Sequence, residues 1–333
     1  MATETIGTGG DRATFSAWYS AISSTTSEAE IGQLLGQAFT DLSWEMNGKT
    51  TSEANYIHLT AHPDHRHDGR SHDVSGAGNA RAVWSTNVRG VHMGDEFLRL
   101  SWVEVDGSAY SGNNKQSIRV AYQAASNAIY IHHNVIHNDL TTGSGGTNSN
   151  GIHVNDSDAI AKIYRNIVYG SDDHNIDNSS STEGCHIIHN TCYETGNEDG
   201  ISAKTDDVVE SNATFNADGD DLAGAGTEDD NATSDSTGDS GASLTSLTAT
   251  NEFKYATNTW GSTDLRVKNN TNLRMKSSGS PYSSSDFPEI DIDIRGRPIT
   301  ETPWTVGADQ VDVVGGGAGV GGASSVSPYI YGS

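Results

Sequence analysis

The segment IYIHHNVIH (129–137) recurs along the chain, and its repetition decides the fold. Each copy but one begins with an apolar or small residue, has an apolar residue two positions later, and has an asparagine three positions after that. The aligned asparagines lie 32, 24, 22 and 58 residues apart. Two of these intervals match one turn of a β-solenoid, and the longer ones indicate turns that carry loop insertions. The other copies are AKIYRNIVY (161–169), CHIIHNTCY (185–193), DVVESNATF (207–215) and LRVKNNTNL (265–273).

A second short pattern lies between these copies and repeats with nearly the same spacing. Its isoleucines, Ile118, Ile152, Ile176 and Ile201, lie 34, 24 and 25 residues apart. Two independent registers with matching spacing indicate that successive turns of the chain stack directly on one another. The segments are SIRV (117–120), GIHV (151–154), NIDN (175–178) and GISA (200–203).

These repeats predict an all-β fold, a right-handed parallel β-helix. Alternation of apolar and polar residues places one apolar side chain from each copy on an inward line, and each turn lies about 4.8 Å above the last. The inward residues are Ile131, Ile163, Ile187, Val209 and Val267. Asparagine suits the recurrent bend because it tolerates left-handed backbone, and stacked asparagines form a hydrogen-bonded ladder. The predicted ladder is Asn134, Asn166, Asn190, Asn212 and Asn270.

The chain divides into three parts by pattern. Residues 1–30 form an N-terminal arm and a short capping helix, because FSAWYSAISS (15–24) has amphipathic helical spacing. Such a helix would cover the edge of the first turn, which would otherwise template aggregation. Residues 31–310 form the β-helix, interrupted by one long acidic loop at 216–247. Residues 311–333 form a glycine-rich tail.

Composition narrows the classes of function. The net charge is −25, from 44 acidic and 19 basic residues. Nucleic-acid binding and attraction to an anionic membrane both need the opposite balance. The first residues lack the features of a secretory signal, and no apolar run is long enough to span a bilayer. The two cysteines, Cys185 and Cys192, occupy inward positions of one turn, so we expect buried, inert core residues.

With these turns in view, the chain resembles the pectate-lyase-like right-handed β-helix superfamily over roughly residues 11–310. More narrowly, it is similar to β-helix proteins carried by tailed phages. The N-terminal part of the resemblance is FSAWYSA followed by NYIHLTAHPDHRHDGR (55–70). The C-terminal part is LRMKSSGSPY (273–282) and DIDIRGRPITETPWTVGADQ (291–310). Ile294 stands where glycine is usual, and Gln310 ends the last motif. The superfamily includes lyases, hydrolases, binding proteins and virion spikes, so the resemblance implies architecture more than activity.

Asp173 and Asp199 are the candidate catalytic residues. They lie in SDDHNID (171–177) and NEDGISAK (197–204), just before the second strand of successive turns, so we expect them to lie close together. Two neighbouring carboxylates can serve as acid and base in glycoside cleavage. Lyase chemistry needs a basic residue, for which Lys204 and Arg165 are the candidates. The alternative interpretation, which the sequence favours, is that these acidic residues form turns.

Two segments contain possible metal ligands. Asp218, Asp220 and Glu228 supply spaced oxygen atoms like those of a calcium loop, but the spacing departs from the EF-hand pattern. The alternative is a solvated acidic loop that needs no cofactor. His62, His65, His67 and His72 cluster in the sequence without the spacing of a compact zinc motif, which favours a surface loop over a transition-metal site.

Three functions are compatible with these patterns, and the sequence favours a non-catalytic one. The first is a structural virion protein of a tailed phage, a head decoration, fibre or spike that contacts host polysaccharide. Its partners would be other virion proteins and copies of itself, as in a trimer. Its tail would anchor through Tyr329, Ile330 and Tyr331. The second is a polysaccharide lyase or glycoside hydrolase, which would be located on the virion or outside the cell. The third is a carbohydrate-binding adhesin without catalysis.

Overall fold

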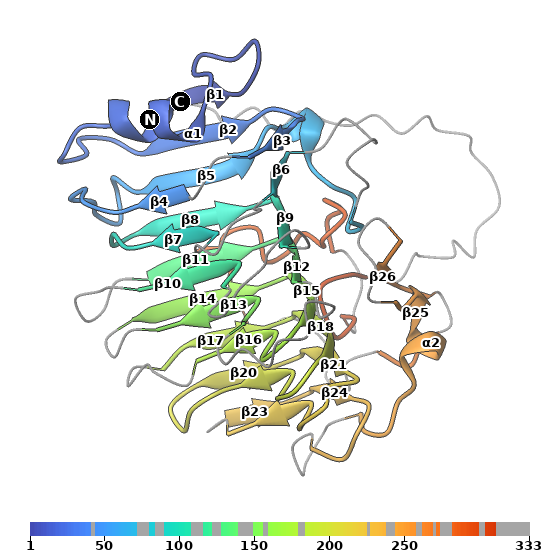
Figure 1. Cartoon of the computed structure of the whole chain (residues 1–333). Coiled ribbons are helices and arrows are strands. Elements are labelled where there is room, and N and C mark those ends of the chain that lie inside the picture. The colour runs from blue at the N-terminus through green and yellow to red at the C-terminus, as the bar shows by residue number, and fades with distance from the viewer. Residues whose placement is uncertain are drawn as a thin grey trace.

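The protein is a stack of β-strand turns with an irregular layer along one side (Figure 1). The computed structural model describes residues 1–40, 44–71, 80–83, 90–107, 116–121, 128–138, 149–155, 159–178, 184–224, 227–237, 244–257, 262–268, 271–273, 282–299 and 304–310.

Three parallel sheets form the body of the molecule. The first sheet contains, in spatial order, β1 (Ala2–Ile6), β2 (Glu30–Leu34), β5 (Ile57–Ala61), β8 (Leu98–Ser101), β11 (Ala128–His132), β14 (Ile160–Tyr164), β17 (His186–Ile188), β20 (Val208–Glu210) and β23 (Thr227–Asp229). The second contains β3 (Ala38–Phe39), β6 (Arg81–Val83), β9 (Glu104–Gly107), β12 (Val135–Asn138), β15 (Ile167–Ser171), β18 (Thr191–Thr195), β21 (Ala213–Phe215) and β24 (Ala232–Thr233). The third contains β4 (Trp44–Met46), β7 (Val91–Met93), β10 (Ile118–Val120), β13 (Ile152–Val154), β16 (Ile176–Asp177), β19 (Ile201–Ser202) and β22 (Leu222–Ala223).

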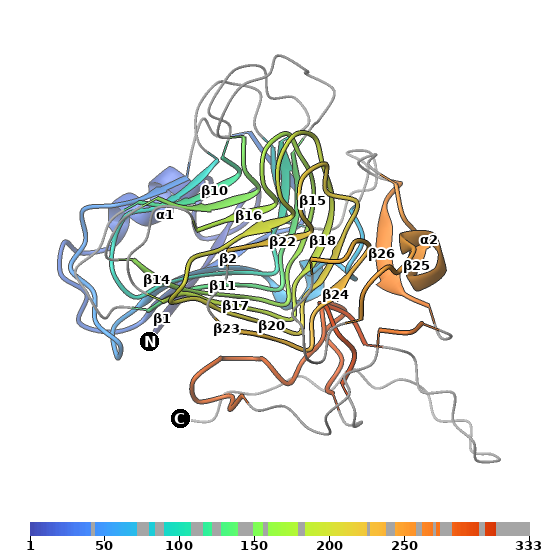
Figure 2. The same ribbon diagram turned by 90° about the horizontal axis from the view of Figure 1, so that it is seen from below.

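The chain visits the three sheets in the same order in every turn, as the strand numbers show. Figure 2, a view from below, shows the sheets as the sides of one cross-section. Every neighbouring pair within these sheets is parallel and joins one turn to the next. The predicted fold class, a parallel β-helix, is confirmed by this topology.

The interior is a column of aliphatic side chains held in register by the strand pairing. Ile131 pairs with Ile163, Ile163 with Ile187, and Ile187 with Val209. In the third sheet the predicted file also forms, because Ile118, Ile152, Ile176 and Ile201 pair in sequence. All of these side chains are buried, and Cys185 and Cys192 belong to the same core as free cysteines. A single turn could not bury these residues alone, so stability comes from stacking.

Two glycines of the repeat are required by the closeness of neighbouring turns. A Cβ atom on Gly151 would lie 2.3 Å from Val168 Cγ1, and one on Gly200 would lie 2.2 Å from Thr214 Cγ2. Both glycines precede strands of the third sheet, where the chain bends inward against the second sheet. The distances leave no room for a side chain, which explains the glycine in GIHV and GISA.

Four of the five predicted ladder asparagines form one buried column at the corner between the first and second sheets. The Asn190 side-chain oxygen accepts hydrogen bonds from the Asn166 backbone N–H at 3.1 Å and from its amide group at 3.0 Å. Asn134 donates to Asn166, and Asn190 donates to Asn212, in the same way. The left-handed residue of each bend is the one before the asparagine, contrary to the expectation above. These residues are His133, Arg165, His189, Ser211 and Asp230.

Two predictions were wrong: that LRVKNNTNL (265–273) forms a turn of the β-helix, and that residues 216–247 form a single acidic loop. Asn212 donates to Asn231, which continues the ladder 19 residues later. The strands β22, β23 and β24 complete this last turn within the supposed loop. The pattern is hidden because Glu228 occupies the register position of Val209, on the outermost turn of the stack. Val267 instead lies in an antiparallel pair outside the column, and Asn270 lies outside the described residues.

The N-terminal end is closed by the predicted helix. Helix α1 (Phe15–Ala21) buries Phe15, Trp18 and Tyr19, and the Thr14 side chain caps it by accepting a hydrogen bond from the Ala17 N–H. Residues before it are more than an arm, because Ala2–Ile6 pairs with Glu30–Leu34 as the first strand of the first sheet. Figure 1 shows α1 at the end of the stack.

The C-terminal part wraps the outside of the β-helix, so the β-helix itself ends well before residue 310. This part contains α2 (Ala249–Glu252) and the antiparallel strands β25 (Phe253–Tyr255) and β26 (Asp264–Val267), followed by a strap, residues 282–299 and 304–310. A second apolar core joins it to the outer faces of the sheets, through contacts such as Phe215 with Phe253. The second sheet is therefore covered on both faces, as parallel sheets usually are.

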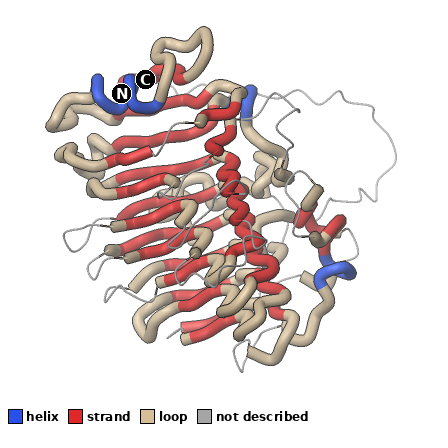
Figure 3. Tube along the Cα trace, in the orientation of Figure 1, coloured by secondary structure: helices blue, strands red, loops and turns tan. Residues whose placement is uncertain are grey.

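Helices are few, as Figure 3 shows. Among the residues that the structure describes, the helical elements are α1, α2 and a 3₁₀ turn, η1, which spans Pro63–His65. No helix in the described ranges combines the length and apolar character needed to cross a membrane.

The asparagine column leads to a stability prediction. Asn190→Ala removes the acceptor for two hydrogen bonds from Asn166 and the donor to Ile163 O and Asn212. Because the groups left behind are buried, we expect unfolding to become easier by about 2–4 kcal/mol. Thermal unfolding followed by circular dichroism measures the change. Asn47→Ala, which alters an exposed asparagine, is the control and should lie within about 0.5 kcal/mol of the wild type. Equal stabilities of the two variants would contradict the ladder's role.

Candidate functional site

The outer face of the third sheet contains a column of ionisable side chains. Strand alternation turns Arg119, His153 and Asp177 outward, and the register stacks them on consecutive turns. His92 precedes Arg119 in the same column. These residues follow the isoleucines of the second repeat, so the sequence contains their positions, but the predicted catalytic candidates were Asp173, Asp199, Lys204 and Arg165. His153, His174 and Arg119 are the site residues that sequence reasoning missed.

The structure brings Asp173 and Asp199 together around one imidazole. His174 Nδ1 lies 3.5 Å from Asp173 Oδ2, and His174 Nε2 lies 3.6 Å from Asp199 Oδ2. Asp173 and His174 precede β16, and Asp199 precedes β19 one turn later. The two carboxylate side chains are 16% and 20% exposed, so they can still be reached from solvent.

A second histidine–carboxylate pair lies beside the first and is more deeply buried. His153 Nε2 lies 3.2 Å from Asp177 Oδ2, and the side-chain amide of Asn150 donates to the same oxygen at 3.0 Å. The backbone N–H of His174 donates to the Asn150 oxygen, which ties the two pairs together. These bonds cross between turns, so the pair also holds neighbouring turns in place.

The two imidazoles have pKa values displaced in opposite directions. Burial lowers the pKa of His174 most, but the contact with Asp173 and the charges of Asp177, Asp173 and Asp199 together outweigh it and raise the pKa. Burial also lowers the pKa of His153, and the opposing charge of Asp177 does not compensate, since Arg119 adds to the lowering. Such opposite displacement is typical of sites that use one group as acid and another as base.

The basic residues proposed for lyase chemistry do not join this group. Lys204 is half-buried beyond the end of β19, where its backbone N–H bonds to Asp207. Arg165 lies at the asparagine corner, fully buried, and donates to the carbonyl oxygens of Gly307 and Ile290 in the strap. Burial lowers the pKa of Arg165 to about 9 against the opposing charges of Asp293, Asp309 and Asp291. Its position shows that Arg165 anchors the strap.

The proposed calcium ligands are dispersed. Asp218 and Asp220 are exposed in the connection before β22, whereas Glu228 lies on β23. Asp220 N–H and the Asp199 side chain form a hydrogen bond, and Asp218 N–H bonds to Thr195. Within the described residues, neither aspartate nor Glu228 belongs to a group of three ligand side chains that meet at one point.

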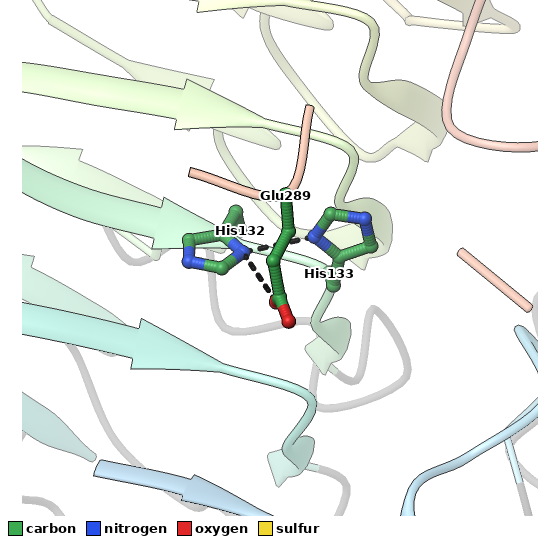
Figure 4. Close-up of side chains that lie close together, drawn as sticks. All are labelled: His132, His133 and Glu289. Atoms are coloured by element: carbon green, nitrogen blue, oxygen red, sulfur yellow. Dashed lines mark hydrogen bonds and ion pairs between the residues drawn. The ribbon is translucent and has the colours of Figure 1, made fainter. Parts of the chain in front are cut away.

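Such a group does form elsewhere in the described part of the chain, from His132, His133 and Glu289 (Figure 4). Their ligand atoms all lie within 4.8 Å of one another. The histidines end β11 at the asparagine corner, and Glu289 comes from the strap. Burial lowers the pKa of both imidazoles well below its usual range. No sequence pattern indicates this group, because Glu289 lies more than 150 residues after the two histidines.

The histidine-rich segment at 62–72 also differs from expectation. His67 is buried, and its Nε2 lies 2.8 Å from the His133 carbonyl oxygen, so it is not part of a surface loop. The rings of His62 and His65 lie near each other, with centroids 5.6 Å apart. His72 lies outside the described residues.

The sheet topology defines the protein as a parallel β-helix, and ionisable side chains form a column on one of its outer faces. Among solved structures, the crystal structure of pectate lyase Pel9A is similar to this chain, with a TM-score of 0.41 and 13% sequence identity over 94% of this chain and 98% of that chain. No protein-family model and no curated protein matches the sequence. The fold is therefore assigned from its own sheet topology.

The opposite pKa displacements can be tested by titrating the histidines. In NMR titrations, His174 should have a midpoint above about 6.5 and His153 one below it, because about 6.5 is the value of an unperturbed histidine. Asp199→Asn should lower the His174 midpoint, whereas Asp172→Asn, the control, should leave it nearly unchanged. A His174 midpoint at or below that of an unperturbed histidine would contradict the geometry.

The same displacement has a consequence for stability. Because the folded-state pKa of His174 is raised, its stabilising contribution is present below the unfolded value and is lost as pH rises through the folded value. The difference in melting temperature between wild type and His174→Gln should therefore shrink between about pH 6 and pH 9. A difference that grows over this interval would show that folding lowers the pKa of His174 instead of raising it.

Proposed function

We propose that the protein is a non-catalytic structural β-helix of a tailed-phage virion, a head decoration, fibre or spike. The observation that supports a structural role is that acidic side chains connect neighbouring turns by hydrogen bonds. Asp207 accepts hydrogen bonds from the Asn178 side chain and from the backbone N–H groups of Cys185 and Lys204. A carboxylate committed to several such bonds is a connector rather than a reactive group.

Other carboxylates of the described residues support the same interpretation. Asp221 accepts from the backbone of Ala217, Ser234 and Asp235. Asp95 accepts from the backbone of Gly48 and Lys49 and from the Tyr19 hydroxyl of the capping helix. The acidic composition thus serves in part to tie loops and turns into a rigid column, which suits a protein used as a shaft or decoration.

The virion location rests on the sequence resemblance and on the tail. The tail residues Tyr329, Ile330 and Tyr331 lie outside the described residues. An apolar tip on a glycine-rich linker would attach the β-helix to a neighbouring virion protein or to another copy, as in a trimer. Host polysaccharide would be met along the outer face of the third sheet, where His174, Asp173 and Asp199 lie. These partners are proposals.

Removing the tail tests this function. A variant that ends at Gln310 should melt at the wild-type temperature, because the strap is held by described contacts such as Arg165 with Gly307 O. It should nevertheless fail to sediment with phage particles, while the full chain sediments with them. Equal sedimentation of both proteins would contradict anchoring by the tail, and recovery of neither would contradict the virion assignment.

Glycoside cleavage is the second candidate, and the placement of His174 between Asp173 and Asp199 favours it. A carboxylate pair with a shared imidazole can supply the acid and the base that hydrolysis needs. The test is release of reducing or unsaturated sugar from acidic polysaccharides. An enzyme should lose this activity in Asp199→Asn and retain it in Asp172→Asn. Binding of glycan without release of sugar would instead indicate the third alternative, an adhesin. If the protein neither binds nor cleaves glycan, the purely structural role remains.

A further inference from the structure

We propose that His132, His133 and Glu289 form a binding site for one divalent transition-metal ion, which fastens the C-terminal strap to the β-helix. Two ligands come from the end of β11 and one from the strap, so the ion would join segments that are far apart in the sequence. The set of two imidazoles and one carboxylate is a common one for zinc and related metals.

The two imidazoles approach each other through nitrogen atoms. His132 Nδ1 lies 2.9 Å from His133 Nδ1. His133 Nε2 lies 2.8 Å from the Ile292 carbonyl oxygen, which only accepts, so Nε2 carries the hydrogen and Nδ1 keeps a lone pair. One shared hydrogen, or one metal ion bound by both lone pairs, resolves such an approach. His132 Nε2 is buried with no hydrogen-bond partner among the described residues in either case. The observation that points to an ion is therefore the approach of the two Nδ1 atoms together with the nearby Glu289 carboxylate.

Both rings are held in these positions by packing. His132 stacks on Tyr164, with ring centroids 4.8 Å apart and planes 7° from parallel. His133 stacks on Trp102 with centroids 4.4 Å apart. The two histidines are 1% and 0% exposed. Rings fixed in this way spend little further conformational entropy on binding an ion.

Glu289 is directed toward the histidines by the strap and by Trp102. Trp102 Nε1–H donates to Glu289 Oε2 at 2.8 Å, and the same oxygen lies 3.9 Å from His132 Nδ1. Glu289 has a left-handed backbone with φ of 59°, a conformation that costs energy for a non-glycine residue and is concentrated at functional sites. Its side chain is 21% exposed, which leaves an approach for an ion.

The spacing suits a metal that binds nitrogen. Four tetrahedral ligands at about 2.0–2.1 Å from zinc lie about 3.4 Å from one another. Two of the observed separations, 2.9 and 3.9 Å, lie on either side of this value, and all three ligand atoms lie within 4.8 Å of one another. Three protein ligands leave a fourth position for water. Arg66 Nη1, 3.8 Å from Glu289 Oε1, adds a positive charge nearby. The two imidazole nitrogens favour Zn²⁺, Ni²⁺ or Co²⁺ over Ca²⁺ and Mg²⁺, which are bound mainly by oxygen ligands.

The consequence is a metal-dependent attachment of the strap. The strap covers the asparagine corner through Arg165, Tyr164 and the second apolar core. A bound ion would stabilise this covered state by mass action, since the ligands meet only when the strap is in place. The column of turns would keep its own hydrogen bonds without the ion.

Binding of Zn²⁺ and Co²⁺ to the full chain tests the proposal. After treatment with EDTA and removal of the chelator, isothermal titration should show one Zn²⁺ per chain, and the melting temperature should rise with Zn²⁺ but not with Mg²⁺. Co²⁺ should develop the visible absorption of a site with nitrogen ligands. No binding at one ion per chain, or a featureless Co²⁺ spectrum, would overturn the proposal.

Three variants locate the ion. His132→Phe keeps the ring that stacks on Tyr164, and Glu289→Gln keeps an oxygen to accept the Trp102 hydrogen bond. Each should weaken Zn²⁺ binding by more than about 100-fold, since loss of an outer partner alone costs about 10–100-fold. His186→Phe is the matched control, an outward histidine of the same sheet that contacts Phe287, and should bind like wild type. Wild-type affinity in Glu289→Gln would overturn the strap's part, even if His132→Phe failed to fold.

Discussion

The whole structure depends on backbone hydrogen bonding between one turn and the next. Each internal strand of the three sheets is parallel to the strand above and the strand below, so one register runs through the stack. That register brings asparagine onto asparagine and isoleucine onto isoleucine. Because the bend is buried, its polar groups need partners, and the asparagine amide supplies them to its own turn and to its neighbours. The column can therefore be long, narrow and poor in apolar residues.

The outer layer answers a different requirement. The second sheet has apolar residues on its outer face, and α2, β25, β26 and the strap cover them in a second core. Arg165 occupies the left-handed position of a turn, is fully buried, and uses its guanidinium to donate hydrogen bonds to strap carbonyl groups. Burial also raises the pKa of Asp309 to about 7. The charge of Arg295 opposes this increase, and the charge of the neighbouring Asp293 adds to it. The same corner that is regular within the column is thus the site where the irregular part of the chain attaches.

The functional features follow from these two layers. Residues that face outward on the third sheet are stacked by the register, which creates the column of ionisable side chains around His174. Residues at the asparagine corner are enclosed by the strap, which creates the group around Glu289. The high acidic content contributes to both, since carboxylates connect turns, cap loops and hold imidazoles. Proposals of a virion shaft, a glycan surface or a metal-fastened strap all use side chains that the fold has already placed.

The sequence alone determined the repeating turns, their register, four of the ladder asparagines, the capping helix and the closeness of Asp173 to Asp199. These features are periodic or local, so the order of residues contains them. It misplaced the last turn, because Glu228 breaks the apolar pattern where the stack ends and an inward apolar side chain is no longer needed. Only the tertiary structure decided that the described parts of 244–310 wrap the column, that Arg165 and His67 are buried, and that Glu289 meets His132 and His133. Such contacts join the repeat to segments that do not repeat, so no sequence pattern indicates them. Their energy comes from burial and hydrogen bonding that exist only once the column has formed.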